Sequence, residues 1–279
     1  MTITITTSNV NGIRAAKRKG IEQWAAKNTP DVWCMQEVRA PQNEIDPIFD
    51  EFGFEYATAG RIADQSGLDR MNEICRIKGR AGVGLLSALP VIDKRYGLPG
   101  LAEDVDSGRW IEADVKTPQG YTVTVVCVYV HAGNTDDPEK MKQKYRFLDT
   151  MLVRMGQLRD EAAHGGRQAV LCGDFNIAHT PLDIKNAKAN EKHAGFLPEE
   201  RAYVDKWLGE LEFVDVMRSL CGDIQGPYTW WSQRGRAFDN NVGWRIDYQF
   251  ATPELAETAR GFVIDKAPTY DLRWSDHAP

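Results

Sequence analysis

The stretch Tyr121–Val130, which reads YTVTVVCVYV, decides the fold class. It is rich in β-branched and aromatic residues, and this composition predicts a central strand that is buried on both faces. The turn sequence Pro-Gln-Gly at 118–120 predicts a hairpin between this strand and a strand at Trp110–Val115. Other alternating or apolar runs predict further strands at Thr2–Thr7, Asp31–Gln36, Gly82–Ser87, Gln168–Cys172, Arg245–Ala251 and Gly261–Ile264.

Helical patterns lie between these predicted strands. In Pro138–Ala163 apolar residues recur every three or four positions, and Asp137 precedes the segment as a plausible N-cap. Weaker amphipathic patterns predict helices at Arg14–Lys27 and Glu199–Gly209. The polar region Gly60–Gly79 is expected to form a long surface loop with a helical turn. Mixed strands and helices indicate an α/β protein whose sheets are covered by helices.

Length and charge limit the classes of protein that remain. The chain has 279 residues, of which 42% are hydrophobic, enough for a sizeable core. The sequence shows no linker rich in proline, glycine or serine, so we expect a single domain over residues 1–279. With 34 basic and 40 acidic residues the net charge is −6, which excludes a globally basic nucleic-acid coat protein but not a local basic patch.

Cysteine usage and the N-terminus predict a cytoplasmic protein. Five cysteines are present, and none forms a CxxC pair. Cys34, Cys127 and Cys172 lie inside apolar runs, which is typical of reduced, buried thiols. The N-terminal residues lack the basic and apolar regions of a signal peptide, and the sequence holds no apolar run of about 18 residues, so no membrane span is expected.

Polar residues follow the predicted strands at the points where catalytic groups can be held accurately. Taken singly, each has an ordinary structural explanation. Asp174 and Asn176 could form an Asx turn, although the apolar Phe175 between them should point into the core. Glu37 could be a solvated loop residue, and Tyr129 a core tyrosine. The other candidates of this kind are Asn9, Asn11, Asp247, Asp276 and His277.

Taken together, these residues point to a hard divalent cation. Carboxylates and amides supply the oxygen ligands that Mg²⁺ prefers. The sequence has no HExxH zinc motif, no P-loop and no GxSxG nucleophile elbow. Metal-assisted attack of water on an anionic centre remains, and phosphodiester hydrolysis fits best.

Eight motifs, in order along nearly the whole chain, resemble the exonuclease III family of apurinic/apyrimidinic endonucleases, within the endonuclease/exonuclease/phosphatase superfamily. The motifs are SNVNGIR at 8–14, QE at 36–37, SGRWI at 107–111, VYV at 128–130, GDFNIAHTPLD at 173–183, YTWW at 228–231, GWRIDY at 243–248 and SDHAP at 275–279. The resemblance implies a deoxyribonuclease-I-like fold, a four-layered sandwich of two packed mixed β-sheets flanked by helices.

The resemblance also implies a role for each matching residue. The catalytic set is expected to be Tyr129, Asp174, Asn176, Asp247 and His277. Ligands or supports of Mg²⁺, for which Mn²⁺ is expected to substitute, would be Asn9, Glu37, Asp174, Asn176, Asp276 and His277. DNA contacts would come from Asn11 and Arg109, and a pocket for the abasic sugar from Trp230, Trp244 and Ile246. Trp231 is expected to be a core residue instead.

The implied activity is incision of duplex DNA on the 5′ side of an abasic site, leaving a 3′-hydroxyl. The protein is expected to be a monomer and to have no membrane partner. A 3′-to-5′ exonuclease activity and cleaning of 3′-blocked ends are expected at the same site.

Basic clusters at Arg14–Lys19, Arg76–Arg80 and Arg234–Arg236 could bind DNA phosphates or be ordinary solvated surface. Two alternatives stay open: a phosphoesterase with a small or lipid substrate, and a catalytically inactive DNA-binding module.

Two departures from the family pattern affect details. The Gln or Asn that usually follows the Tyr129 position is absent, so we expect either that a phosphate contact is lost there or that His131 or Asn134 replaces it. Family members continue with a short strand after SDHAP, whereas this sequence stops at Pro279. We therefore expect a chain without that final C-terminal strand, in which Asp276 and His277 are poorly anchored.

Overall fold

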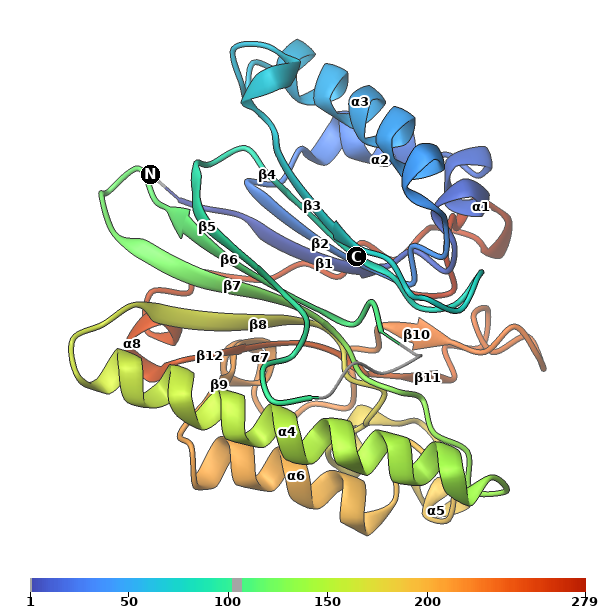
Figure 1. The fold of residues 1–279 in the computed structure, drawn as a ribbon. Coiled ribbons are helices and arrows are strands. Elements are labelled where there is room, and N and C mark those ends of the chain that lie inside the picture. Colours follow the sequence, from blue (N-terminus) through green and yellow to red (C-terminus); the bar gives the residue numbers. More distant parts are fainter. Residues whose placement is uncertain (1, 102–106) are drawn as a thin grey trace.

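Two mixed β-sheets pack face to face in the computed structural model, which describes residues 2–101 and 107–279. Helices α1 to α3 cover the outer face of one sheet, and α4 and α6 cover the outer face of the other (Figure 1). The predicted α/β sandwich of two mixed sheets flanked by helices is therefore confirmed.

The first sheet has the strand order β1-β2-β4-β3, in which β1 and β2 are parallel and the other pairs are antiparallel. Its strands are β1 (Ile5–Asn9), β2 (Val32–Gln36), β4 (Val83–Ser87) and β3 (Asp69–Glu73). The helices on its outer face are α1 (Ile13–Arg18), α2 (Ile21–Asn28) and α3 (Gln42–Thr58).

The second sheet has the order β5-β6-β7-β8-β12-β9, with only β7 and β8 parallel. Its strands are β5 (Val91–Tyr96), β6 (Trp110–Lys116), β7 (Thr122–Tyr129), β8 (Gln168–Asp174), β12 (Asp247–Ala251) and β9 (Val214–Asp215). A separate small ribbon pairs β10 (Trp230–Trp231) with β11 (Gly243–Trp244). The other helices are α4 (Pro138–Ala163), α5 (Ala187–Asn190), α6 (Pro198–Gly209), α7 (Val216–Cys221) and α8 (Pro253–Ala256), with single turns η1 (Gln65–Gly67), η2 (Pro181–Asp183) and η3 (Tyr270–Leu272).

Strand β7 is buried on both faces, as its composition predicts. Val125 and Cys127 belong to the core between the two sheets, whereas Val126 and Val128 belong to the core under α4. The neighbouring strand β8 approaches so closely that a Cβ on Gly173 would lie 1.9 Å from the carbonyl oxygen of Val128. Glycine is therefore required at 173, immediately before the residue that ends β8.

Three predicted elements are corrected. The helix expected over Arg14–Lys27 is two helices, because Gly20 between them has a φ of 97°. The expected loop Gly60–Gly79 contains the helical turn η1 but also the strand β3, a polar edge strand held by pairing with β4. The strand expected at Gly261–Ile264 is absent: this stretch forms no ladder, and Val263 is 82% exposed.

Several short elements and two longer ones, helix α3 and strand β5, were not predicted from the sequence. Helix α3 contains Pro47 in its interior, yet Ile45, Phe49 and Phe52 lie on one buried face at helical spacing. That spacing was the signal available to find it. Edge strand β5 has mostly exposed residues and depends on its pairing with β6.

The predicted state of the cysteines is confirmed: all five are free, and Cys34, Cys127 and Cys172 are fully buried. Among the helices of the described residues, none has both the length and the apolar character needed to cross a membrane.

Candidate active site

Three neighbouring strands of the second sheet place their polar residues side by side. Tyr129 at the end of β7 is the register partner of Asp174 at the end of β8. Asp247 at the start of β12 is also paired with Asp174, because β12 runs antiparallel to β8. Side chains two apart share a face of a strand, so Asp174 follows Cys172 toward the first sheet, where β1 and β2 end.

Asp174 is fully buried and surrounded by hydrogen-bond donors. Its Oδ2 accepts from Asn9 Nδ2 at 2.8 Å and from Asn176 Nδ2 at 3.2 Å. Its Oδ1 accepts from the backbone N–H of Asn176 at 2.9 Å, so the Asx turn exists and the carboxylate is still aimed into the site. Burial and the nearby charge of Asp247 raise the pKa of Asp174 to about 7. Phe175 points into the core, as predicted.

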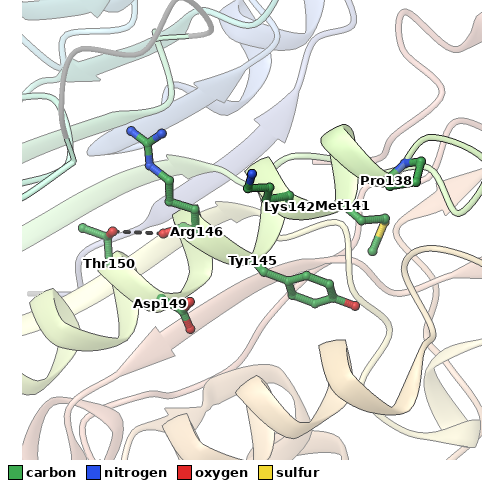
Figure 2. Close-up of a pocket in the computed structure, with 7 residues that line it drawn as sticks. All are labelled: Pro138, Met141, Lys142, Tyr145, Arg146, Asp149 and Thr150. Atoms are coloured by element: carbon green, nitrogen blue, oxygen red, sulfur yellow. Dashed lines mark hydrogen bonds between the residues drawn. The ribbon is translucent and has the colours of Figure 1, made fainter.

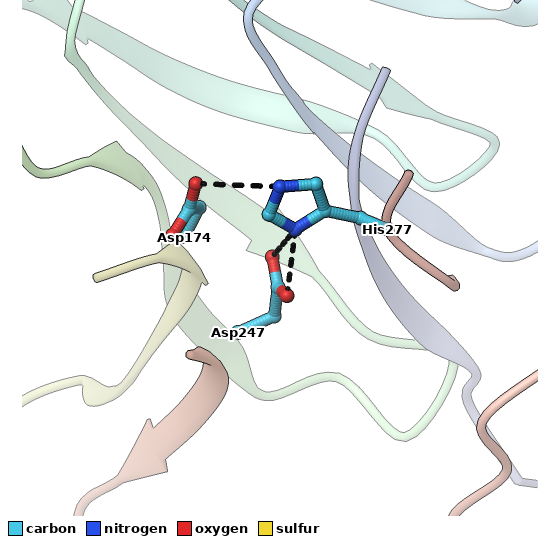
Figure 3. Close-up of side chains that lie close together, drawn as sticks. All are labelled: Asp174, Asp247 and His277. Atoms are coloured by element: carbon cyan, nitrogen blue, oxygen red, sulfur yellow. Dashed lines mark hydrogen bonds and ion pairs between the residues drawn. The ribbon is translucent and has the colours of Figure 1, made fainter. Parts of the chain in front are cut away.

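His277 is held between two carboxylates, as Figure 3 shows. Its Nδ1 lies 2.9 and 3.1 Å from the two carboxylate oxygens of Asp247, and its Nε2 lies 3.9 Å from Oδ2 of Asp174. Burial disfavours the imidazolium, but the charge and hydrogen bonds of Asp247 and the charge of Asp174 raise the pKa of His277 to about 9. The ring is therefore cationic at neutral pH, with Nδ1 committed to Asp247.

Glu37 closes the site from the end of the first sheet. It follows β2 with a φ of 54°, and its Oε1 accepts from Asn9 Nδ2 at 3.0 Å and from the Tyr129 hydroxyl at 2.6 Å. Burial and the charge of Asp174 raise the pKa of Tyr129 to about 12, so its hydroxyl remains a donor. Asn9 bridges Glu37 and Asp174 through its amide nitrogen, while its oxygen accepts from the backbone N–H of Asn11.

Asp276 is anchored, contrary to expectation. Its Oδ1 accepts from Asn11 Nδ2 at 2.7 Å and its Oδ2 from Trp230 Nε1 at 3.2 Å. Burial opposes ionisation, but the charge of His277 and these hydrogen bonds bring the pKa of Asp276 below its ordinary value. The neighbouring backbone is held as well, because His277 forms a β-bridge with Trp230 and the hydroxyl of Ser275 donates to Asn9 O at 2.6 Å.

The three predicted pocket residues lie together, and Trp230 borders His277. Trp230 and Trp244 are paired across the β10–β11 ribbon, with ring centroids 5.9 Å apart and nearly perpendicular planes. Both rings pack on a small apolar cluster that includes Ile246. Trp231 points away from this cluster and is 2% exposed, so its expected core position is confirmed.

Arg109 and His131 are less exposed to solvent than expected for residues that contact DNA, and Asn134 lies in a local turn. The guanidinium of Arg109 lies 4.6 Å over the Tyr129 ring and donates to the Tyr129 carbonyl at 3.3 Å, and the residue is 8% exposed. His131 is buried and lies edge-on against Phe147, and its replacement of the phosphate contact stays a prediction. The side-chain oxygen of Asn134 accepts from the backbone N–H of Asp136 in a local turn.

Two cations of the site were missed by sequence reasoning. Arg39 forms an ion pair with Glu37 and donates to Asn11 Oδ1 at 2.7 Å. Lys144 on α4 is fully buried behind the site, where its Nζ lies 2.5 Å from Glu200 Oε1 and donates to the carbonyls of Ala132 and Asn176. The QEVR sequence at 36–39 offered a signal for Arg39. Lys144 offered none, because its partners Ala132, Asn176 and Glu200 are distant in sequence.

The surface has two cavities, and the second of them adjoins the site. A cavity of about 540 Å³ lies on α4, where Arg146 O accepts from the Thr150 hydroxyl, and its lining includes none of the predicted site residues (Figure 2). A second cavity of about 400 Å³ is lined by Gly12, Arg14, Ala15, Arg18, Arg39 and Gly79. Arg14 and Arg18, from the predicted basic cluster at 14–19, therefore lie in the same cavity as Arg39.

Comparison with known proteins agrees with this geometry. An exodeoxyribonuclease of Bacillus subtilis is 29% identical over 97% of this chain and 95% of its own length. An apurinic/apyrimidinic endonuclease structure from Archaeoglobus fulgidus is 29% identical, with a TM-score of 0.80 over 99% of this chain and 97% of that one. The structure of a 3′ phosphatase from Neisseria bound to a product DNA hairpin is 27% identical, with a TM-score of 0.79 and the same coverage. The model of the endonuclease/exonuclease/phosphatase family matches residues 6–277, and the chain belongs to that family.

Proposed function

We propose that this chain is a DNA-repair phosphodiesterase that hydrolyses duplex DNA. The observation that carries the proposal is the alignment of Tyr129, Asp174 and Asp247 across three strands, closed by His277 and Glu37. The names of the relatives, an exodeoxyribonuclease and an apurinic/apyrimidinic endonuclease, support the same reaction class.

The donor set fits Mg²⁺, with Mn²⁺ as a substitute. Asn9 joins Glu37 to Asp174, and Asn11 links Asp276 to Arg39, which is paired with Glu37. Asp247 adds a further carboxylate beside Asp174. Glu37 and Asp276 would hold the ion. A bound Mg²⁺ would withdraw charge from the non-bridging phosphate oxygens and stabilise the leaving 3′-oxygen. Asn9 and Asn176 present amide nitrogens to Asp174, so we assign them the support of the carboxylate rather than ligation.

The protein's own side chains divide the remaining work. Asp174, with a pKa near neutrality, would orient and deprotonate the attacking water. The imidazolium of His277 would donate to a phosphate oxygen through Nε2, while Asp247 fixes the ring through Nδ1. The Tyr129 hydroxyl would turn from Glu37 to a phosphate or leaving oxygen. Such donors matter because they face charge that grows in the transition state.

The aromatic wall would select the damaged nucleotide. An abasic sugar leaves the helix at lower cost than an intact nucleotide, and Trp230, Trp244 and Ile246 form an apolar surface against which it could lie. We therefore propose incision on the 5′ side of the abasic site, leaving a 3′-hydroxyl. The Neisseria 3′ phosphatase supports a second use of the site in cleaning 3′-blocked ends. The Bacillus subtilis exodeoxyribonuclease supports exonuclease activity, for which we propose the 3′-to-5′ direction.

Contacts to the DNA backbone would come from Asn11 and from the basic cavity beside it. Arg109 is proposed to steady Tyr129 and, through it, the phosphate. We propose that the protein acts as a monomer.

The proposal is tested with a duplex oligonucleotide that carries a tetrahydrofuran abasic analogue. We expect Mg²⁺-dependent incision on its 5′ side and its loss in Asp174→Asn. Asp205→Asn, which changes an exposed carboxylate paired with His179, is the matched control and should retain activity. Preferred hydrolysis of phosphoinositides, or tight binding of abasic DNA without turnover in Mg²⁺ and Mn²⁺, would contradict the proposal.

A further inference from the structure

Arg39 lies between the carboxylate proposed to hold the cation and the cavity proposed to receive DNA. One of its guanidinium nitrogens is ion-paired with Oε2 of Glu37, and the other donates to Asn11 Oδ1 at 2.7 Å. The second oxygen of Glu37 is already shared by Asn9 and Tyr129. A cation that approaches Glu37 therefore meets Arg39 as a competitor for the same carboxylate.

The backbone around Arg39 is fixed while its side chain reaches solvent. Glu37 and Arg39 both have φ values in the left-handed region, 54° and 53°. The carbonyl of Glu37 accepts from Gly12 N at 2.7 Å, and Arg39 N donates to Ala81 O at 2.9 Å. The Arg39 side chain is 38% exposed, so its guanidinium can turn without disturbing these hydrogen bonds.

The direction in which it can turn is the basic cavity. Arg39 lines this hollow of about 400 Å³ together with Arg14 and Arg18. While Glu37 neutralises Arg39, the cavity has less positive charge to offer a phosphate. A guanidinium freed from Glu37 would supply a planar fork of donors that matches phosphate oxygens.

We propose that Arg39 couples cation binding to DNA binding: a divalent cation at Glu37 releases Arg39, which then contacts a DNA backbone phosphate in this cavity. The coupling rests on the proposed function, because it needs the cation at Glu37 and DNA as the ligand. By linkage it acts in both directions, so DNA in the cavity strengthens cation binding by the same factor.

The first measurement is the Mn²⁺ affinity of the protein without DNA, from the electron paramagnetic resonance signal of free Mn²⁺. Arg39→Met removes the competing charge while keeping the length of the side chain, so Mn²⁺ should bind roughly three- to tenfold more tightly. Arg18→Met, which lines the same cavity, should stay within about twofold of the wild type because its charge does not pair with Glu37.

The second measurement is the affinity for an abasic-analogue duplex with Ca²⁺ and with chelator, checking that the oligonucleotide stays intact. The ratio of the two affinities should fall roughly three- to tenfold in Arg39→Met, persist in Arg39→Lys, and persist in Arg18→Met although overall affinity drops. Melting temperatures establish that each variant is folded.

Three results would overturn the coupling, and they are distinguishable. Unchanged Mn²⁺ affinity in Arg39→Met, or an unchanged affinity ratio, refutes the role of Arg39 and leaves the proposed function standing. Mn²⁺ binding that is insensitive to Glu37→Gln refutes the cation site at Glu37, and with it both proposals.

Discussion

Two buried acidic clusters in this protein differ in how their charge is balanced. Asp183 and Asp215 are held by two guanidinium groups: Arg245 contacts both carboxylates, and Arg218 contacts Asp183 at 2.5 Å. Asp174 and Asp247, among the described residues, share His277 as their ion-pair partner. Asp183 and Asp174 are buried to the same degree, at 0% and 1% exposure.

The pKa values follow from this difference. Burial alone would raise both, but Arg245 and Arg218 bring the pKa of Asp183 below its ordinary value, whereas burial and Asp247 raise that of Asp174 to about 7. A carboxylate neutralised by arginine stabilises the fold. A carboxylate left short of positive charge attracts a cation and can exchange a proton, which are the properties of a catalytic site.

The cluster of Asp183, Asp215, Arg218 and Arg245 also holds a segment of the site in place. Arg245 lies between Trp244 and Ile246 in sequence, and its guanidinium stacks 4.4 Å from the centre of the Tyr248 ring. Its ion pairs hold this segment against the turn at Asp183. The Trp230–Trp244 surface is thereby fixed by a structural cluster, while the proposed catalytic groups occupy the other cluster.

The largest expected effect is on kcat, which should depend on the Asp174 cluster and not on the Asp183 cluster. Asp174→Asn removes the proposed base and should lower kcat for abasic-site incision by roughly 10³-fold or more, with the fold retained. Asp183→Asn should leave kcat per folded molecule within about tenfold of the wild type, because it touches no reacting group. Kinetics normalised to the folded fraction measure both. Equal losses of kcat in the two variants would contradict the assignment of a catalytic role to Asp174 and a structural role to Asp183.

Stability should show the reverse order. Asp183→Asn leaves Arg245 buried with one carboxylate fewer, so the free energy of unfolding should fall by about 3–5 kcal/mol. Asp174→Asn should not destabilise the protein at pH 8 in chelator, because it removes a carboxylate whose ionisation is opposed by burial and by the charge of Asp247. Urea denaturation of both variants tests this, and a larger loss in Asp174→Asn would be inconsistent with the comparison.

The pH dependence of stability follows from the direction of each shift. Asp174 has a pKa raised above its unfolded value of 3.8, so its contribution is present below pH 3.8 and lost as pH rises to about 7. His277, raised from 6.5 to about 9, loses its contribution between those values. In chelator, stability should fall by roughly 2–4 kcal/mol between pH 4 and 7 from Asp174.

The control for this pH effect is Asp174→Asn, which should flatten the fall between pH 4 and 7 and leave the later loss from His277. Asp183 has the opposite sign: its pKa is lowered, so its contribution is lost only as pH falls below 3.8. A pH profile of denaturant midpoints that is unchanged in Asp174→Asn would contradict the assigned shift.

The smallest expected effect is stabilisation by a divalent cation. At a concentration ten times its Kd, Mg²⁺ should raise the free energy of unfolding by about 1.4 kcal/mol at pH 8. Glu37→Gln should lose this gain and Asp183→Asn should keep it. Melting curves with and without Mg²⁺ provide the measurement, and a gain that survives Glu37→Gln would place the cation elsewhere.

Sequence patterns predict the elements that end at the site, because strands such as Tyr121–Val130 are specified by their own apolar residues. Asp174, Tyr129 and Asp247 follow or begin such strands, so their convergence could be predicted. Edge strands β3 and β5 could not, since their stability comes from pairing with a neighbour.

The balance of charge around each buried carboxylate cannot be predicted from the sequence either. Asp183 and Arg245 are 62 positions apart, and Lys144 on α4 meets Glu200 on α6 only in the folded chain. Nothing in the local sequence distinguishes Asp183, which is neutralised, from Asp174, which is not. This distinction separates the structural cluster from the proposed catalytic one, and it requires the tertiary structure.

The most direct test of the central claim is anomalous diffraction from crystals soaked in Mn²⁺. We expect a peak about 2 Å from a carboxylate oxygen of Glu37, with Asp276 near the same ion, and none at Asp183. A peak at the arginine-balanced cluster, or none beside Glu37 at saturating Mn²⁺, would contradict the account.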